Sequence, residues 1–396
     1  MITAPQPEAA EAGAAVLASG GTAVDAVLAC ALTQGVVDPL MCGIGGLGVM
    51  QVHDPARGRT EVFDGLSTCP AAAHATMWAD RFERECPDGF GYVVAGHVNE
   101  LGHQAVTTPG ILRVFAAAHE AFGRMAWSAL FAPAIGFATE GWILRPHVAG
   151  VFATDERAYG RLPYRDKLAL TADGRRLYLR PDGTPKRLGD RVLNPDLATT
   201  LSAIARDGAA AFYNGALARR IADDMARNDG LLALGDLASF RSRRVAPLRV
   251  DYRGRTVALP PPPTGGVVIG QMLRILERFD LVAFGHNTPE YVRVLAEAMK
   301  IAGRDKDEFI GDPDFVAPPL ERLLSDGYAE ECAARIRRGE VAPLSRVLAE
   351  PADTTTVSCV DADGMIASLT HTLGVPSGVI PPGAGFMLNG GMNWYD

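Results

Sequence analysis

The sequence predicts a layered domain of the α/β or α+β class. Strand-like runs lie near both ends of the chain, and segments with helical periodicity lie between them. There is no internal repeat and no low-complexity linker, so the pattern favours one layered domain over a string of modules. The 396 residues are 48% hydrophobic and 21% charged, which is enough apolar material for a large core.

The expected elements follow in chain order from local signals. Residues 7–18 form an amphipathic helical pattern that stops at two glycines, and Thr22 can cap a buried helix over 23–37. Residues 49–53 and 59–64 alternate like a strand pair. Further helices are expected at 111–140, 194–228, 267–277 and 288–304, and a strand at 252–259.

The charge balance excludes two classes of partner. The net charge is −8, from 38 basic and 46 acidic residues, and the longest basic cluster is the Arg-Ser-Arg-Arg run at 241–244. Nucleic acid or an anionic membrane would need a larger basic surface, so we expect neither as a partner.

The cysteines and the N-terminus bear on the compartment. The six cysteines are scattered without a Cys-x-x-Cys pair and are expected to be small buried side chains, although their even number leaves disulfides open. Residues 1–13 lack the features of a signal peptide, and the apolar stretch 23–37 is too short to span a bilayer. We therefore expect a cytoplasmic protein, or a periplasmic or secreted one if the N-terminus has been trimmed.

Neither the glycine-rich run nor the histidines predict a cofactor or metal site. Residues 43–48 match the G-x-G-x-x-G dinucleotide fingerprint, which requires a strand before it and a helix after it. Here a helix precedes and a strand-like run follows, so we expect a tight turn where backbone approaches backbone or substrate. The histidines lack helical metal-ligand spacing, and the sequence predicts neither a metal site nor a cofactor.

The segment 353–372 is the strongest candidate for chemistry. It reads as two β runs around an Asp-Gly turn. If 362–364 form a three-residue loop with Gly364 in the left-handed conformation, Thr354 lies directly opposite Thr372. The two hydroxyls would then be within hydrogen-bond reach. Threonine favours sheets in general, so the spacing alone leaves a purely structural role open.

Several spaced motifs resemble the γ-glutamyltranspeptidase family. They run in the family's order at 12–26, 38–39, 42–46, 210–215, 236–240, 260–266, 296–298, 311–315 and 354–372. The last of these matches the segment in which the family carries its nucleophile. The resemblance implies an N-terminal-nucleophile hydrolase with an α+β fold, a four-layer αββα sandwich.

The resemblance also implies a mechanism. The chain would cut itself between Asp353 and Thr354, and Thr354 would become an N-terminal nucleophile. Its α-amino group, with a pKa of about 7.7–8.0, would be neutral in roughly a tenth of molecules at pH 7 and could act as general base. Thr372 matches the family's second threonine and would orient and polarise Thr354.

The same resemblance sets the expected organisation and partners. Residues 1–353 would be the large-subunit segment and 354–396 the beginning of the small-subunit segment, with both forming one structural domain. The partner would be a small-molecule amide substrate, and a homodimer of processed chains is left open.

The positions that bind the γ-glutamyl group in the family are altered here. Leu66 stands in place of the arginine that grips the α-carboxylate, and Gly374 in place of an asparagine. Gly391 and Trp394 stand where the family binds the ammonium. Truncating one partner of a buried charge pair costs about 2–5 kcal/mol, so we expect a less polar or smaller acyl group. A misalignment by one or two residues would not restore the clamp, because no arginine lies between residues 60 and 80.

A second departure concerns the glycines whose amides form the family's oxyanion hole. They lie beyond the run matched at 388–396, so we expect the C-terminal strands to be missing and the chain as given to be a poor catalyst. Removing one oxyanion donor costs about a hundredfold to a thousandfold in rate. The alternative is an unprocessed, inactive relative that acts as a binding or assembly module.

Overall fold

A computed structural model describes residues 1–89, 91–343 and 354–394. They divide into two units: residues 1–59, 63–244 and the described part of 348–396 form the first, and 60–62 with the described part of 245–347 form the second. The second unit has a hydrophobic core of its own, and the expectation that the two subunit segments form one structural domain stays a prediction. The division at 353/354 into two subunit segments stays a prediction.

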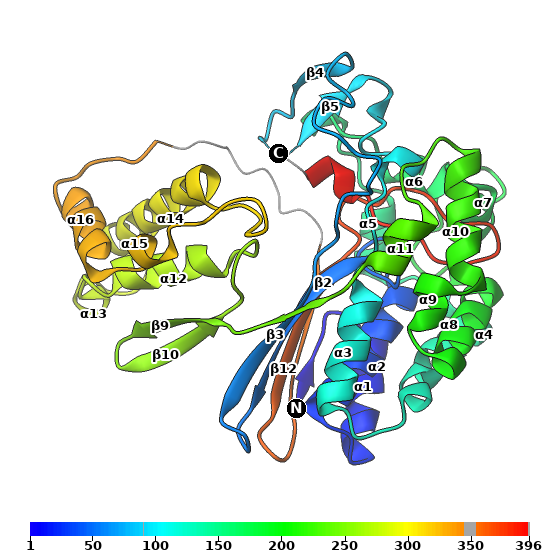
Figure 1. Cartoon of the computed structure of the whole chain (residues 1–396), viewed down its shortest axis with the longest axis horizontal. Helices are drawn as coiled ribbons and strands as arrows, with labels where there is room; N and C mark the ends of the chain where they lie inside the picture. Colours follow the sequence, from blue (N-terminus) through cyan, green and yellow to red (C-terminus); the bar gives the residue numbers. More distant parts are fainter. Residues whose placement is uncertain (90, 344–353, 395–396) are drawn as a thin grey trace. The chain divides into compact units, whose positions relative to one another are not determined.

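A six-stranded sheet is the framework of the first unit (Figure 1). Its strand order is β1-β11-β12-β2-β3-β8, and the first four strands pair antiparallel. The strands are β1 (Ile2–Thr3), β2 (Leu47–Asp54), β3 (Arg59–Gly65), β8 (Arg243–Val245), β11 (Thr355–Val360) and β12 (Ile366–Thr372). Strands near both ends of the chain are present, as the sequence predicted, and they lie side by side in one sheet.

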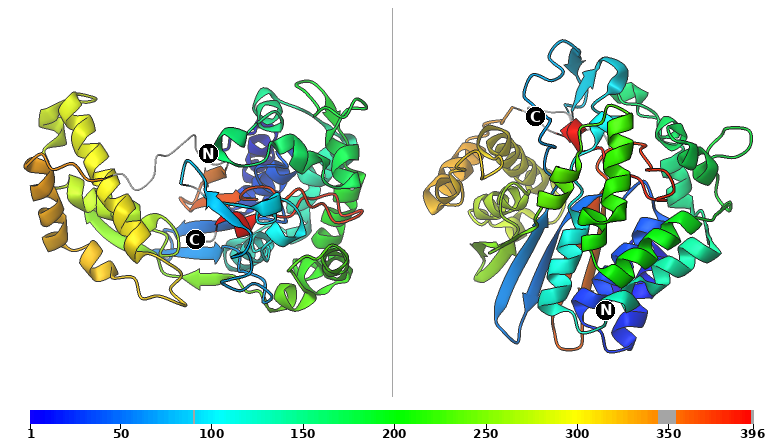
Figure 2. Two further views of the ribbon diagram at one scale, coloured as in Figure 1. Left: turned by 90° about the horizontal axis from the view of Figure 1, so that it is seen from above. Right: turned by 45° about the vertical axis from the view of Figure 1, so that its right-hand side comes forward.

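Helices cover one face of this sheet (Figures 1 and 2). Helix α2 packs against β11 and β12, α3 packs against β2, and α1 and α4 pack against α2. The helices of this unit are α1 (Pro7–Ala18), α2 (Ala23–Val37), α3 (Ile111–Phe122), α4 (Ala132–Glu140), α5 (Pro146–Phe152), α6 (Tyr164–Ala169), α7 (Ala172–Tyr178), α8 (Pro195–Asp207), α9 (Ala210–Asn214), α10 (Ala216–Arg227) and α11 (Leu234–Ser239). The expected long helices over 111–140 and 194–228 are thus divided into shorter ones.

Helix α2 forms where the sequence predicted it. Thr22 accepts a hydrogen bond from the Asp25 backbone N–H, and the Asp25 carboxylate accepts one from the Thr22 N–H, which completes a capping box. Every residue of α2 except Gly35 is buried. A helix that is apolar all round needs neighbours on all sides, and the sheet and the surrounding helices supply them.

Short elements complete the first unit. Two further two-stranded sheets pair β4 (Phe82–Glu85) with β5 (Tyr92–Val94) and β6 (Trp142–Ile143) with β7 (Arg191–Val192). The 3₁₀ helices are η1 (Ala95–His97), η2 (His103–Ala105), η3 (Trp127–Phe131), η4 (Arg157–Tyr159) and η5 (Gly391–Trp394).

The second unit consists of a β-hairpin and a group of helices. Its strands are β9 (Leu248–Tyr252) and β10 (Arg255–Leu259), and its helices are α12 (Gly266–Leu276), α13 (Leu281–Phe284), α14 (Pro289–Phe309), α15 (Leu320–Leu323) and α16 (Asp326–Arg337). The prediction of one strand over 252–259 is wrong. Arg253 and Gly254 have positive φ angles of 50° and 74°, and this two-residue turn folds the segment back on itself.

The structure tests the expectations for the cysteines and for the apolar helices. All six cysteines are described and none forms a disulfide; five are buried as expected, but Cys69 is exposed. Among the described residues, no helix combines the length and apolar character that crossing a membrane requires.

Candidate active site

The β11–β12 hairpin has the register that the sequence predicted. Thr355 pairs with His371 and Thr356 with Thr370, and Gly364 in the turn has a φ of 82°. Continuing this register by one residue sets Thr354, which directly precedes β11, opposite Thr372 at the end of β12. The turn and the pairing are confirmed, whereas the catalytic roles of the two threonines stay predictions.

The two faces of this hairpin differ in chemistry. Thr355, Val357 and Cys359 are buried against the helical layer. The opposite face carries hydroxyls: the Oγ1 atoms of Thr356 and Thr370 lie 3.0 Å apart, and the Oγ atoms of Ser358 and Ser368 lie 2.9 Å apart. Because side chains alternate along a strand, Thr354 belongs to this hydroxyl face. Thr354 is exposed, and Thr372 is buried.

A buried polar network lies behind the threonines, on the helical side of the sheet. Gln34 of α2 donates from Nε2 to Thr355 Oγ1 at 3.1 Å, and its Oε1 lies 3.0 Å from His371 Nε2. Gln34 also donates to Gln6 at 2.7 Å, and Gln6 donates to the buried Asp38 at 2.7 Å. One glutamine thus holds the residues that adjoin both threonines. No local sequence pattern predicted this network.

His371 is neutral in this network. Burial lowers the pKa of its imidazole to about 3, because a charged ring would be removed from water. Its Nε2–H therefore donates to the side-chain amide oxygen Oε1 of Gln34.

The glycine-rich run 43–48 packs against the same strands. A Cβ on Gly46 would lie 2.3 Å from the Thr372 carbonyl oxygen, and one on Gly45 would lie 2.4 Å from the Met387 carbonyl oxygen. Only glycine permits such close backbone approach. The expected close approach is confirmed, as is the strand that follows the run.

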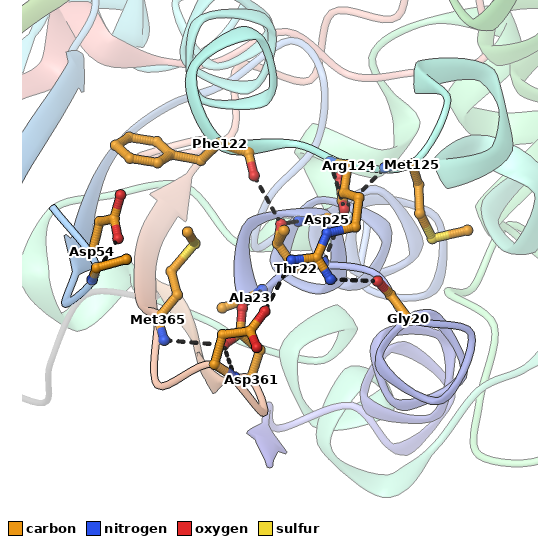
Figure 3. Close-up of polar contacts among 12 residues, drawn as sticks. Gly20, Thr22, Ala23, Asp25, Asp54, Phe122, Arg124, Met125, Asp361 and Met365 are labelled. Carbon is orange, nitrogen blue, oxygen red and sulfur yellow. Dashed lines mark hydrogen bonds and ion pairs between the residues drawn. The ribbon is translucent and has the colours of Figure 1, made fainter.

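The far end of the hairpin is anchored to the helical layer (Figure 3). Asp361 accepts hydrogen bonds from the backbone N–H of Met365 at 3.0 Å and from that of Ala23, the first residue of α2, at 2.9 Å. Asp25 accepts from the backbone N–H of Arg124 at 3.0 Å, which ties α2 to the loop after α3. The hairpin is therefore held at its turn as well as behind its threonines.

Two of the altered binding positions adjoin Thr372. Gly374 is buried with a φ of 68°, and its backbone N–H donates to Thr372 Oγ1 at 2.9 Å. Gly390 donates from its N–H to the Leu373 carbonyl oxygen at 3.0 Å, so the next residue, Gly391, lies close to the same strand end. A side chain at 391 has no room, because a Cβ there would meet Thr107 Oγ1 at 2.3 Å.

Asn389 fixes this turn and was not singled out from the sequence. It is fully buried, and its Oδ1 accepts from the Thr107 hydroxyl at 2.6 Å and from the Gly391 N–H at 3.0 Å. Its Nδ2 donates to the Gly45 carbonyl oxygen at 2.9 Å. An asparagine followed by two glycines was the available signal, but its partners lie far away in the sequence.

The remaining predicted positions are Leu66, Trp394 and Asp353. Leu66 follows β3, is half-buried, and donates from its N–H to Asp64 Oδ1 at 2.9 Å. Trp394 is the last residue of η5, and Gly391 is its first. Asp353 lies outside the described residues.

The histidines contact protein groups. His103 lies 3.0 Å from Asp224, His97 lies 3.3 Å from Glu100, and His119 lies 2.8 Å from the Met125 carbonyl oxygen. Within the described residues, no three His, Cys, Asp or Glu side chains are placed to hold a metal ion together.

Comparison with known proteins gives the family. The family model of γ-glutamyltranspeptidase matches residues 9–395. The chain belongs to the γ-glutamyltranspeptidase family. It is 36% identical over 404 residues to the acylase ACY 1 proenzyme of Pseudomonas sp. (strain V22), covering 100% of this chain and 69% of that protein. It is 32% identical over 402 residues to the glutathione hydrolase proenzyme of Escherichia coli, covering 99% of this chain and 66% of that protein.

Solved structures of the family have the same fold. The cephalosporin acylase of Bacillus halodurans aligns with a TM-score of 0.83 at 28% identity, covering 99% of this chain and 69% of that one. The γ-glutamyltranspeptidase of Helicobacter pylori aligns with a TM-score of 0.77 at 28% identity, covering 88% of this chain and 95% of that one. The α+β class and its likeness to N-terminal-nucleophile hydrolases are confirmed. The chain spans about two thirds of the curated relatives it matches.

Proposed function

We propose that this chain is an autoprocessing amidase that uses Thr354 as its nucleophile. The observation that carries the proposal is the β11–β12 register, which sets Thr354 and Thr372 opposite each other on a face already lined by paired hydroxyls. The relatives named above support it, since two of them are called proenzymes and two are called acylases.

The proposed processing step begins at the peptide bond before Thr354. The Thr354 hydroxyl oxygen attacks the Asp353 carbonyl carbon, the C–N bond breaks, and an ester replaces the amide while the nitrogen takes the proton. Water then hydrolyses this ester. The products are a carboxylate at Asp353 and a free α-amino group on Thr354.

Substrate turnover repeats this chemistry on an external amide. The neutral α-amino group takes the proton from the Thr354 hydroxyl as its oxygen attacks the acyl carbon, and it returns that proton to the departing amine. Water then cleaves the acyl ester. Thr372 acts as the positioning residue, because its hydroxyl is held by the Gly374 N–H at 2.9 Å and faces the nucleophile across the strands.

The proposed acyl group is not γ-glutamyl. Leu66 replaces the carboxylate-binding arginine, and Gly391 leaves no side chain to meet an ammonium. A zwitterionic acyl group at these positions would lose its hydration without gaining charged partners.

The test compares two p-nitroanilides, one with a γ-glutamyl and one with an uncharged acyl group. We expect release of p-nitroaniline from the uncharged one, no release by Thr354→Ala, and normal release by Thr356→Ala, a control on the same face. Faster turnover of the γ-glutamyl compound would contradict the proposed acyl specificity. Equal activity of the Thr354→Ala and Thr356→Ala proteins would contradict the proposed nucleophile.

A further inference from the structure

An open apolar pocket lies between the two segments that carry the altered binding positions. Its volume is about 630 Å³, within the usual range for small-molecule sites. Its larger side chains are Met77, Trp78, Phe82, Tyr92, Val94 and Met392. Among its described lining residues there is no arginine, lysine, aspartate or glutamate, and its one imidazole, His74, is exposed to solvent.

The walls of this pocket are held by specific contacts. Trp78 donates from its indole Nε1 to Gln104 Oε1 at 3.3 Å, which fixes the ring orientation. The rings of Phe82 on β4 and Tyr92 on β5 meet edge to face, with centroids 5.8 Å apart. Phe82 is 55% exposed, so this aromatic wall remains accessible.

Hydrogen bonds connect the pocket to the candidate active site. Met392 follows Gly391 in the turn that is bonded to the end of β12 through Gly390 and Leu373. Asn99 donates to the Tyr92 carbonyl oxygen at 2.8 Å and to Asn393 Oδ1 at 2.9 Å, so the aromatic hairpin and this turn are fastened together.

The opposite wall connects to the same turn. Cys69, which lines the pocket, follows Thr68, and Thr68 pairs with Thr108 through a backbone bond of 3.0 Å. The neighbouring Thr107 bonds to Asn389, which holds Gly391 in place. The same hydrogen bonds therefore hold the pocket walls and Gly391, one of the positions at which the family's γ-glutamyl-binding residues are replaced.

We propose that this pocket receives the acyl group of the substrate, and that this acyl group is bulky and apolar. The inference rests on the proposed function, since it names the acyl class for the amide cleaved at Thr354. Aromatic and thioether walls favour an apolar group by burying its surface and by edge-to-face contacts. A carboxylate or ammonium would be desolvated there without an ionic partner.

Cys69 provides a direct reporter of occupancy. It is the exposed thiol of the pocket, whereas the other five cysteines are buried. The probes are phenylacetamide, acetamide and glutamine, three primary amides with a bulky apolar, a small and a zwitterionic acyl group. The readout is the rate of Cys69 alkylation by iodoacetamide, followed by peptide mass spectrometry, with Cys69→Ser to identify the labelled site.

We expect saturating phenylacetamide to slow alkylation of Cys69 about tenfold, with a dissociation constant at least about tenfold below those of acetamide and glutamine. Phe82→Ala should weaken phenylacetamide binding severalfold. The matched control is Phe315→Ala, which removes a phenyl ring that is 87% exposed in the second unit and should leave binding unchanged. Equal protection by all three amides, or no protection by any, would overturn the inference.

Turnover separates this inference from the proposed function. If Thr354 cleaves all three amides at equal rates, the assignment of the pocket to an apolar acyl group is wrong, while the assignment of Thr354 as nucleophile is supported. If phenylacetamide protects Cys69 while none of the amides is hydrolysed, the pocket stands and the proposed catalysis fails.

Discussion

Thr356 and Thr370 face each other across β11 and β12, with their hydroxyl oxygens 3.0 Å apart. The next pair along the same face, Ser358 and Ser368, repeats this contact at 2.9 Å. Cross-strand hydroxyl pairs are therefore a regular property of this face. The proposed mechanism uses the position one step further toward the open end of the hairpin, where Thr354 meets Thr372.

Replacing Thr372 tests its positioning role. Thr372→Val keeps the shape but removes the hydroxyl, and we expect kcat to fall about tenfold to a hundredfold, equivalent to about 1.4–2.7 kcal/mol for a lost polar contact in the transition state. The control is Thr370→Val, on the same face but one pair further from the nucleophile, which should change kcat less than about threefold. Steady-state kinetics of both variants measure this; equal losses would contradict a specific role for Thr372.

Gln34 is expected to be the main polar support of the hairpin. Gln34→Leu leaves His371, Gln6 and Thr355 without their shared partner in a buried site, so we expect a loss of about 2–4 kcal/mol in the free energy of unfolding. Thr33→Val is the control, since its hydroxyl donates to the Ala29 carbonyl oxygen of its own helix and takes no part in the network. Urea denaturation measures the free energy of unfolding of both variants. Similar losses in the two would show that the Gln34 network stabilises the fold no more than a single buried hydroxyl does.

His371 should make the protein less stable in acid. Its pKa is about 3 in the folded protein against an ordinary value of about 6.5, so below pH 6.5 the unfolded chain binds a proton that the folded chain does not. The contribution of His371 to the free energy of unfolding is fully present above pH 6.5. It is lost as the pH falls toward 3, at about 1.4 kcal/mol per pH unit.

The variant His371→Gln isolates this effect. Glutamine can still donate to Gln34 but does not titrate, so the difference in unfolding free energy between wild type and variant should shrink as the pH is lowered from 6.5. Denaturation at several pH values measures it. A difference that stays constant with pH would mean that His371 is not held neutral.

Leu66→Arg should partly restore recognition of a carboxylate. An arginine at this position offers bidentate hydrogen bonds that leucine cannot, so we expect kcat/KM for γ-glutamyl-p-nitroanilide to rise about tenfold or more. Leu66→Met, which changes the shape but adds no charge, should give no rise. Equal values for the two variants would count against the assignment of Leu66 to the carboxylate position.

Local signals were sufficient for much of the fold. The Thr22 cap, the left-handed Gly364 and the alternation in β11 and β12 each depend on neighbours within a few residues, and each is present in the structure. The hairpin at 248–259 was missed because the Arg253-Gly254 turn interrupts a continuous β-type pattern.

The site was less accessible from the sequence, because its contacts join distant parts of the chain. Gln34 and His371 are 337 residues apart, and Thr107 and Asn389 are 282 apart. No periodicity or spacing rule connects such pairs. The apolar pocket also joins distant parts of the sequence, since Met392 lines it together with Trp78 and Phe82.

The most direct test of the account is the intact mass and N-terminal sequence of the purified protein. We expect two fragments, one ending at Asp353 and one beginning with a free α-amino group on Thr354. Thr354→Ala should remain a single chain, while Thr356→Ala should be cleaved like the wild type. An uncleaved wild-type chain, or cleavage that persists in Thr354→Ala, would contradict the claim that Thr354 is the nucleophile.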